Sequence, residues 1–491
     1  MAGSDPEYVD VLIIGAGISG IGAAHSVRMD LPGKSFLLLE ARDAIGGTWD
    51  LFRYPGVRSD SDLYTFGYEF RPWTEPESIA RGDRILAYLE DTVRDEGIRD
   101  RIRFGHRVTS AAWSSADARW RVVVDGADGL ETTLTCSWII CATGYYRYDA
   151  GYTPELAGLD RFRGRVVHPQ QWPADLDHRG KRIVVVGSGA TAVTLLPALA
   201  EEAAHVTMLQ RTPTYVLPIL GTDRLAQRLR RLLGDARAHA VIRRKNIAVQ
   251  RLVWLASRRL PGLMRRLIRA ADRRALPPGY PVDEHFSPPY DPWDQRLCFA
   301  PDGDFFRVIR EGSADVVTDR IATFAEDGIE LESGRQLRAD IVVTATGLVV
   351  EPFGGVTLTV DGEPVTLAER VAYRGVLLDG VPNLAYVIGY TNASWTLKVG
   401  LACGYVTRLI DHLDANGFTS CRPERPAAGM ATRPLLDFGA GYVRRAVEHL
   451  PRQGDRDPWR TSTGYADDVR LLRQAPLTDP LLRFERARAA G

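Results

Sequence analysis

The sequence lacks the long apolar runs that a membrane-spanning protein would need. No stretch of its 491 residues approaches the roughly 20 consecutive apolar residues of a transmembrane helix. The N-terminal segment is acidic, and its first apolar run, residues 9–14, is too short for a secretory signal peptide. The formal net charge is zero, so the chain as a whole has no electrostatic attraction for nucleic acid. We therefore expect a soluble, cytoplasmic protein that does not bind nucleic acid.

Cysteine is also scarce, and its spacing is irregular, which favours a reducing compartment. The five cysteines are Cys136, Cys141, Cys298, Cys403 and Cys421. Only Cys136 and Cys141 have the CxxxxC spacing of a redox-active disulfide, so a pyridine-nucleotide disulfide reductase is one hypothesis. However, the segment between them has the pattern of a strand, which would span roughly 16 Å. Because a disulfide needs Cα atoms within about 7 Å, this hypothesis is disfavoured. No residue pattern predicts a metal site.

Lysine is nearly absent, since 4 of the 62 basic residues are lysine and the other 58 are arginine. We attribute this bias to genomic base composition rather than to function. The rest of the composition is ordinary for a globular protein, with 45% hydrophobic and 25% charged residues. At this length, the chain is expected to form two or three domains with a large buried core.

Two glycine-rich turns are the most informative features that are present. Each follows a short apolar run, residues 9–14 or 183–186, and precedes a stretch compatible with a helix. Their key positions are Gly15, Gly17 and Gly20 in the first turn, and Gly187, Gly189 and Ala192 in the second. Such turns bring the backbone close to a pyrophosphate at a helix N-terminus. The sequence therefore predicts two dinucleotide-binding sites.

The residues that follow these turns predict which dinucleotide each site binds. In the first unit, the next strand ends on Glu40, and an acid there accepts hydrogen bonds from a ribose with a free 2′-hydroxyl. In the second unit, the corresponding strand leads into Arg211 and Thr212, and an arginine suits a 2′-phosphate. We therefore predict FAD at the first site and NADPH at the second, as in a flavin-dependent oxidoreductase.

The expected fold is α/β, with two dinucleotide-binding, Rossmann-like domains. We expect the FAD-binding domain to comprise residues 1–148 and to be completed by residues 338–491. The NADPH-binding domain, residues 149–337, is inserted between these parts and carries a helical insertion at 221–285. Each half also contains a strand that ends in Ala-Thr-Gly, at 142–144 and 345–347.

The region 221–275 is strongly basic, with 16 Arg or Lys against three Asp, a net charge of 16 − 3 = +13. Leucines alternate with these arginines, which indicates amphipathic helices with a basic outer face. One interpretation is a helical insertion that packs on the NADPH unit and faces solvent. The other is contact with an anionic membrane surface or a partner subunit. The sequence leaves both open, together with the oligomeric state.

Two longer motifs resemble signatures of the type I Baeyer–Villiger flavin monooxygenases. The segment 162–173 fits the pattern FxGxxxHxxxWP, through Phe162, Gly164, His168 and Trp172. The second motif runs from residue 46 through a Tyr-Pro-Gly to an aspartate, and contains Gly47, Thr48, Trp49 and Asp60. The resemblance covers nearly the whole chain and is closest to the thioamide-prodrug-activating branch of the family, typified by the ethionamide-activating monooxygenase.

The resemblance implies a reaction. The family uses FAD, NADPH and O2 to form a flavin 4a-peroxide, which inserts one oxygen atom into a ketone to give an ester or lactone. The same chemistry can oxygenate sulfides or thioamides, so the implied substrate is a ketone or a sulfur-containing small molecule. A dedicated N- or S-oxygenating flavin monooxygenase is the alternative, and Trp172 and the Asp60 segment weigh against it.

The resemblance also assigns catalytic and hinge residues. Arg296 would stabilise the negative charge that develops during oxygen transfer, and Asp60 would orient its guanidinium. The other reading of Asp60 is a helix N-cap, because it precedes an apolar helical run. His168 lies in the connector between the domains, where a structural or gating role is favoured over acid–base catalysis. We group Phe162, Gly164 and Trp172 with it.

Overall fold

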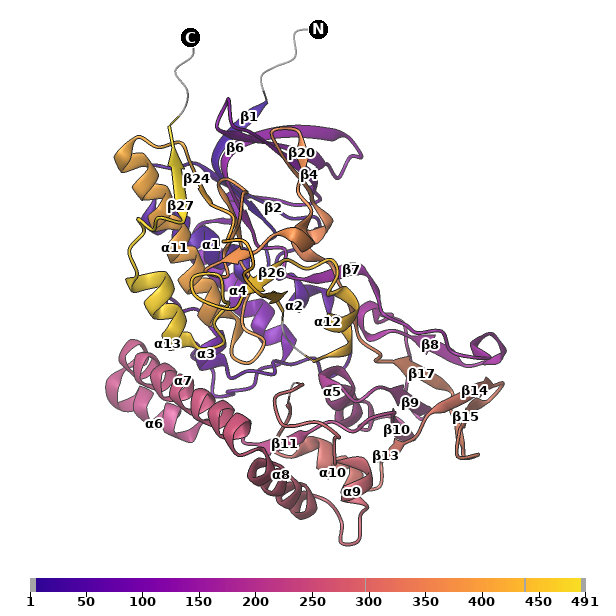
Figure 1. The fold of residues 1–491 in the computed structure, drawn as a ribbon. Helices are drawn as coiled ribbons and strands as arrows, with labels where there is room; N and C mark the ends of the chain where they lie inside the picture. Colours follow the sequence, from indigo (N-terminus) through magenta and orange to yellow (C-terminus); the bar gives the residue numbers. More distant parts are fainter. Residues whose placement is uncertain (1–5, 296, 437–438, 487–491) are drawn as a thin grey trace.

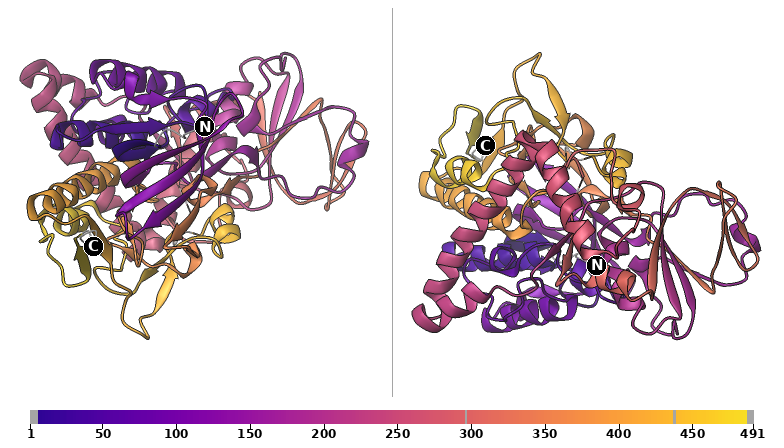
Figure 2. Two further views of the ribbon diagram at one scale, coloured as in Figure 1. Left: turned by 90° about the horizontal axis from the view of Figure 1, so that it is seen from above. Right: turned by 90° about the horizontal axis from the view of Figure 1, so that it is seen from below.

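The computed structural model describes residues 6–295, 297–436 and 439–486 of the chain. They form two α/β units that lie side by side, with a set of helices along one edge (Figure 1). The second unit projects from one side of the first (Figure 2).

A large mixed sheet organises the first unit, and its parallel core has the order β3-β2-β1-β6-β23. These strands are β3 (Ile102–Arg103), β2 (Phe36–Leu39), β1 (Glu7–Ile14), β6 (Glu131–Cys141) and β23 (Leu384–Tyr386). From β6 the sheet continues through the antiparallel strands β5 (Arg119–Asp125) and β4 (Arg107–Ser114). Strand β19 (Thr357–Val360) then pairs in parallel with β4, and β20 (Glu363–Pro364) pairs antiparallel with β19. Strand β2 is short, apolar and buried, and β6 ends in the buried run 138–141, as expected where parallel strands are covered on both faces.

The C-terminal part of the chain returns to complete this unit. Strand β23 pairs in parallel with β6, alongside residues 139–141. Helix α11 (Trp395–Asn416) packs against α1 (Ile18–Asp30), the helix that follows the first glycine turn. Two small antiparallel pairs finish the region, β24 (Ser420–Pro423) with β27 (Leu482–Glu485) and β25 (Thr432–Pro434) with β26 (Arg452–Gly454).

The second unit is built on a five-stranded parallel sheet with the order β13-β10-β9-β17-β8. Its strands are β13 (Ala314–Thr318), β10 (His205–Gln210), β9 (Arg182–Val186), β17 (Ile341–Thr344) and β8 (Arg165–Val167). Because β17 pairs with β9, the unit includes residues beyond the expected boundary at 337. That boundary was placed one strand too early, since a short apolar run does not reveal which of two parallel sheets it joins.

The chain crosses between the units twice, and the two crossings pair with each other. Strand β7 (Tyr146–Gly151) leads into the second unit, and β18 (Leu348–Val350) leads back from it. They are antiparallel, with Leu348 opposite Gly151 and Val350 opposite Tyr146. The units are therefore joined by a two-stranded ribbon.

The insertion at 221–285 folds into helices, as the sequence predicts, namely α6 (Arg224–Leu233), α7 (Asp235–Arg259), α8 (Pro261–Ala275) and α9 (Val282–His285). The long helix α7 packs on α3 (Leu63–Phe66) of the first unit, whereas one interpretation expected the insertion to pack on the NADPH unit. The buried Arg243 donates hydrogen bonds to the carbonyl oxygens of Tyr64, Thr65 and Gly67, at 2.9–3.2 Å. These bonds satisfy carbonyls at the end of α3, which explains why an arginine is buried here.

Candidate active site

The two glycine turns have the same geometry, and in both the glycine abuts an Ala-Thr-Gly segment. Gly15 has φ +101°, and a Cβ at this position would lie 2.8 Å from the carbonyl oxygen of Ala142. Gly187 has φ +140°, and a Cβ there would lie 2.3 Å from the carbonyl oxygen of Ala345. Any side chain would push the turn away from the neighbouring strand. Gly17 and Gly189 then form the N-caps of α1 and of α5 (Ala190–Leu199).

Glu40 closes the first turn from the end of β2. One carboxylate oxygen accepts the Ala16 backbone N–H at 2.8 Å, and the other accepts that of Arg42 at 3.0 Å. The side chain is almost fully buried, and this burial raises the pKa of Glu40 despite the two hydrogen bonds. The carboxylate also lines the cavity described below, so it is placed to accept a hydrogen bond from a ligand hydroxyl.

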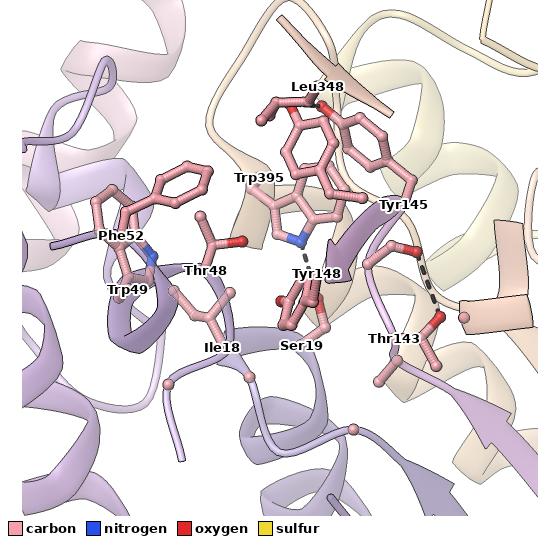
Figure 3. A pocket seen from close by; sticks show the side chains of 18 of the residues that line it. Ile18, Ser19, Thr48, Trp49, Phe52, Thr143, Tyr145, Tyr148, Leu348 and Trp395 are labelled. Carbon is pink, nitrogen blue, oxygen red and sulfur yellow. Dashed lines mark hydrogen bonds between the residues drawn. The ribbon is translucent and has the colours of Figure 1, made fainter. Parts of the chain in front are cut away.

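A second loop, Gly46–Trp49, is held against the first turn. A Cβ at Gly17 would lie only 3.6 Å from the Cα of Gly47. The Arg42 guanidinium donates to the carbonyl oxygen of Gly47 at 3.2 Å and pairs with the Asp50 carboxylate at 2.6 Å. Thr48 and Trp49 begin α2 (Thr48–Leu51), and both side chains line the cavity (Figure 3).

Between these loops and the second unit lies a cavity of about 380 Å³. The first unit contributes both glycine loops, Glu40 and the Asp60 segment, while the second contributes α5 and Phe299. Figure 3 shows Trp49, Tyr148 and Trp395 reaching it from separate elements, and the Trp395 indole N–H donates to Ser19 Oγ at 2.8 Å. Gly15, Gly17, Glu40, Gly47, Thr48, Trp49 and Asp60 all line this cavity.

This cavity is where an FAD would fit, to judge from the chain's own groups. Helix α1 begins at its rim, with Gly17 as the cap and no capping side chain, so its first N–H groups can receive a pyrophosphate. Glu40 supplies an acceptor for a ribose, and aromatic side chains supply flat apolar walls. Tyr145 and Tyr148 belong to a segment that we expected to be only a connector between the two units, and they were not predicted to line the site. Their aromatic content was the available signal.

Asp60 reaches the cavity through a segment that is wedged against the second unit. Gly56 has φ +75°, and a Cβ there would lie 2.7 Å from Ala198 Cβ and 2.9 Å from the Thr194 carbonyl oxygen, both on α5. The buried Tyr54 hydroxyl hydrogen-bonds Thr191, and burial raises its pKa to about 12. The position of Asp60 is therefore set by contact with the neighbouring unit.

Asp60 does not cap the helix that follows it. The N-cap of α3 is Asp62, which accepts the Thr65 backbone N–H at 3.1 Å. Nearby, Arg58 forms an ion pair with Asp304 of the second unit, which fixes the segment from its other side. Arg296, the predicted catalytic arginine, lies outside the described residues. Phe299, on the strand that begins at Cys298, lines the cavity opposite the glycine loops.

The residues predicted to bind NADPH lie together at the carboxyl ends of β9 and β10. Ser188 Oγ donates to the carbonyl oxygen of Thr212 at 2.9 Å, so the second glycine turn and the residue after Arg211 are in direct contact. Ala192 is fully buried in the first turn of α5. Arg211 is exposed and has no ion pair among the described residues. Its guanidinium is therefore available to a ligand phosphate.

His168 ties both interdomain strands to the second unit. Its Nε2 donates to the carbonyl oxygen of Gly347 at 3.1 Å, and its Nδ1 accepts the Gln170 backbone N–H at 3.2 Å. The Gln170 side chain donates to the Arg147 carbonyl oxygen on β7 at 2.7 Å. Burial lowers the pKa of His168, which keeps the imidazole neutral. Both ring nitrogens of His168 are therefore engaged in hydrogen bonds within the chain.

The other residues of this motif pack within the second unit or against its core. Phe162 stacks edge-on against Phe324, with ring centroids 5.9 Å apart. A Cβ at Gly164 would lie 2.5 Å from the Asp340 carbonyl oxygen, so the backbone just before β8 lies close to the backbone just before β17. Trp172 packs, half-buried, against the hydrophobic core that includes α5.

The part of the chain that the structure describes contains no helix that is both long and apolar enough to cross a membrane. It also contains no cluster of three or more histidine, cysteine or carboxylate side chains that could hold a metal ion.

Comparison with known proteins identifies the family. The profile described as pyridine nucleotide-disulphide oxidoreductase matches residues 9–236, which hold both glycine turns. The chain is 50% identical over 479 residues to the FAD-containing monooxygenase EthA of Mycobacterium tuberculosis, covering 97% of this chain and 98% of EthA. The chain belongs to the FAD-containing monooxygenases. It is also 43% identical to the probable FAD-binding monooxygenase AlmA of Acinetobacter baylyi, over 98% of this chain and 97% of AlmA.

Solved structures share the fold of this FAD-containing monooxygenase. A steroid monooxygenase bound to NADP aligns with a TM-score of 0.77 at 24% identity, covering 98% of this chain and all of that one. Cyclohexanone monooxygenase from Rhodococcus sp. Phi1, bound to NADP+, aligns with the same TM-score at 20% identity and the same coverage. The predictions of two dinucleotide-binding domains, of a flavin monooxygenase and of FAD as its cofactor are thus confirmed.

The disulfide-reductase alternative finds no support in this FAD-containing monooxygenase. Cys136 and Cys141 are both free and buried, and both lie on the extended strand β6. Burial raises the pKa of both thiols, to about 11 for Cys141. Neither is placed to act as a redox nucleophile.

Proposed function

We propose that this FAD-containing monooxygenase is a Baeyer–Villiger enzyme that inserts one atom of O2 into a ketone and also oxygenates sulfides or thioamides. In the ketone reaction, ketone, O2, NADPH and a proton give an ester or lactone, NADP+ and water. The two motifs at 46–60 and 162–173 support this proposal. So does the likeness in fold to proteins named steroid monooxygenase and cyclohexanone monooxygenase.

The first half of the site would bind FAD. Bound FAD, once reduced, activates O2 for transfer to the substrate. Glu40 would accept a hydrogen bond from the ribose, and the N-terminus of α1 would receive the pyrophosphate. Gly47 and Thr48 belong to the loop that would lie along the rest of the cofactor, since the Gly46 backbone N–H donates to the Ala16 carbonyl oxygen of the first turn at 3.0 Å.

The second half of the site would bind NADPH. The exposed Arg211, next to Thr212 and the second glycine turn, would pair with the 2′-phosphate. The steroid monooxygenase and the Rhodococcus cyclohexanone monooxygenase that share this fold are bound to NADP and NADP+, which supports this coenzyme. Gly189 and the first turn of α5 would receive the coenzyme pyrophosphate in the same manner as α1 receives that of FAD.

Between the two halves, Asp60 and Arg296 would carry the charge stabilisation. A ketone that receives oxygen acquires negative charge on its carbonyl oxygen, and a fixed guanidinium can donate hydrogen bonds to that oxygen. Asp60 would orient the guanidinium of Arg296 through a carboxylate–arginine pair. Since the Asp60 segment is wedged on α5, closure of the two units would also set this pair.

The observation that carries the proposal is the cavity, because groups from both dinucleotide-binding units line it. A reductant held by the second unit and a flavin held by the first would meet there. The walls of Trp49, Tyr145 and Trp395 would help exclude water from the reacting groups.

The test is incubation of the FAD-loaded protein with NADPH, ¹⁸O2 and a panel of ketones and sulfides, with mass spectrometry of the products. A Baeyer–Villiger enzyme gives esters or lactones that carry one heavy oxygen atom. Labelled sulfoxides without any ester would favour the dedicated S-oxygenase instead. NADPH consumption without a labelled product from any substrate would overturn both.

The role of Arg296 is tested in the same assay. Arg296→Ala should still allow NADPH to reduce the flavin, while ester formation falls by about 100-fold or more. Arg182→Ala, at an exposed arginine on β9, is the control and should behave as the parent protein. An unchanged ester yield in Arg296→Ala would show that another group stabilises the charge.

A further inference from the structure

Exposed apolar side chains gather on the helical insertion. Of the fourteen large hydrophobic residues that are exposed among the described residues, ten lie between positions 220 and 267. They are Leu220, Leu225, Leu232, Leu233, Val241, Val249, Leu252, Leu260, Leu263 and Leu267. Leu232 is 79% exposed and Leu252 is 66% exposed. So dense a group of exposed leucines marks an interaction surface.

These side chains share their surface with unpaired arginines. Nine exposed arginines of the insertion have neither an ion pair nor a side-chain hydrogen bond within the described ranges. They are Arg224, Arg228, Arg231, Arg237, Arg244, Arg251, Arg259, Arg266 and Arg274. The region 221–275 has a net charge of +13 while the whole chain is neutral, so the charge is concentrated here.

Helical spacing orders both kinds of side chain on α7. Arg237, Arg244 and Arg251 are spaced by two turns, so they form one line along the helix. Val241 and Leu252 lie in the strip beside them, on the outer side of the helix, and both are exposed. The inner side of α7 is different, because its buried residues, such as Ala238 and Ile242, belong to the hydrophobic core of the first unit.

Helix α8 continues the pattern. Leu263 and Leu267 are one turn apart and both exposed, with Arg266 on the adjoining strip. Leu260, at the junction of α7 and α8, is 54% exposed. In the view from below, α7 and α8 run across the face nearest the reader (Figure 2). We call the exposed side of α6, α7 and α8 the basic helical face.

We propose that the basic helical face binds the surface of an anionic phospholipid bilayer. A helix that only faces water places its leucines inward, whereas here leucines and arginines both point outward. This combination fits a bilayer surface, where leucines enter the acyl boundary and arginines contact lipid phosphates. The charge argues against a second copy of the chain on the same face, since a two-fold interface would set +13 against +13.

The test is flotation of the full-length, FAD-loaded protein with vesicles. We expect the protein to float with phosphatidylcholine vesicles that contain phosphatidylglycerol, about tenfold more than with phosphatidylcholine alone, and to be released by high salt. Absence of flotation with the anionic vesicles, or equal flotation with both kinds, would overturn the proposal.

Two sets of variants separate the contribution of the arginines to vesicle binding from that of the leucines. The triple change Arg237→Glu, Arg244→Glu and Arg251→Glu should abolish flotation, and Leu252→Ser with Leu263→Ser and Leu267→Ser should reduce it about tenfold. The charge control is Arg121→Glu, Arg182→Glu and Arg320→Glu, at exposed arginines elsewhere, and the apolar control is Leu130→Ser with Val166→Ser.

Flavin content and circular dichroism establish that each variant is folded. Both control sets should float like the parent protein. If the arginine variants and their controls bind vesicles equally, the basic helical face is not the lipid site. If light scattering shows a dimer that only the leucine variants dissociate, while vesicles bind nothing, the face is a subunit interface and the proposal is wrong.

Discussion

Nε2 of His168 lies 3.1 Å from the carbonyl oxygen of Gly347, and the hydrogen bond between them crosses 179 positions of sequence. The same carbonyl oxygen accepts the backbone N–H of Tyr152 at 3.0 Å. One oxygen atom therefore joins the chain entering the second unit, the chain leaving it and the motif segment between them. The imidazole also packs against Gly151, where a Cβ would lie 1.9 Å from the ring.

Removal of this link should impair turnover without loss of flavin. We expect His168→Ala to lower turnover by about tenfold or more, because the two units would no longer be held in one relative orientation. FAD content should stay at the parent level, since His168 does not line the cavity. Absorbance of the bound flavin and steady-state rates measure both, with His178→Ala as the control. Equal losses in both variants would assign the effect to general destabilisation.

The stability of this junction should fall with acid. Burial holds the pKa of His168 in the folded protein below the ordinary value of 6.5, so the neutral form is favoured by folding. Its contribution is fully present above pH 6.5 and is lost as the pH falls below that value towards the folded pKa. Thermal melts at pH 7.5 and 5.5 should show a smaller acid loss in His168→Gln than in the parent protein. An unchanged difference would place the acid sensitivity elsewhere.

Gly56 should not tolerate even a methyl group. Gly56→Ala adds both backbone strain at φ +75° and a clash with α5, so we expect a loss of about 1–3 kcal/mol in the free energy of unfolding. Because the change displaces the Asp60 segment, product formation should fall as well. Chemical denaturation and the product assay measure the two effects.

A matched change at a second glycine separates the effect of backbone strain from the effect of the clash with α5. Gly97 has φ +62° and open space around it, so Gly97→Ala carries the strain alone. Adding Ala198→Gly to Gly56→Ala removes the contact with the Ala198 methyl group and should restore part of the stability. If Gly56→Ala and Gly97→Ala cost the same and the second change restores nothing, the wedge against α5 is not what fixes Asp60.

Arg211 should set the preference for coenzyme. With Arg211→Ala, the KM for NADPH should rise about tenfold or more while the KM for NADH stays nearly constant, since only NADPH carries the 2′-phosphate. Initial rates with both coenzymes provide the comparison, and Arg182→Ala again serves as the control. A parallel rise for both coenzymes would mean that the arginine does not read the phosphate.

Asp272 on α8 should cost stability at neutral pH. Its side chain is fully buried, neither carboxyl oxygen has a hydrogen-bond partner among the described residues, and burial raises its pKa to about 8. The folded pKa exceeds the ordinary 3.8, so stability present at low pH is lost as the pH rises from about 4 to 8. Asp272→Asn cannot ionise and should be more stable at pH 7 by about 2–4 kcal/mol, and nearly equal at pH 4. Melting temperatures at both pH values test this, with the exposed Asp100→Asn as the control. A constant difference between the two pH values would contradict it.

Much of this architecture could be predicted from short, local patterns in the sequence. The glycine turns, Glu40 and Arg211 were predicted because a strand, a tight turn and a helix follow one another within a short stretch of sequence. The geometry of Gly15 and Gly187 bears this out, as each has the positive φ that the turn requires. The helices of the basic region were predictable for the same reason, since their periodicity is local.

Contacts between distant segments could not be predicted in the same way. The position of Asp60 depends on two contacts between the units, that of Gly56 with α5 and that of Arg58 with Asp304. Because the two partners of each contact lie far apart in the sequence, local patterns do not reveal them. The membership of β17 in the second sheet depends on its pairing with β9. The burial of Arg243 on the inner face of α7 could not be predicted either. In the sequence it is one of many arginines, and its three carbonyl partners lie more than 170 positions away.

The paired strands β7 and β18 also determine how the two units can move. A domain on a single linker can swivel in any direction, whereas a two-stranded ribbon bends readily out of its plane and resists bending within it. We therefore expect any rocking of the second unit over the first to be close to rotation about one axis, once the Gly56 contact with α5 and the Arg58–Asp304 ion pair are released. Arg211 would follow a fixed arc relative to Glu40, and the path by which a substrate enters the cavity would be set by the plane of the ribbon.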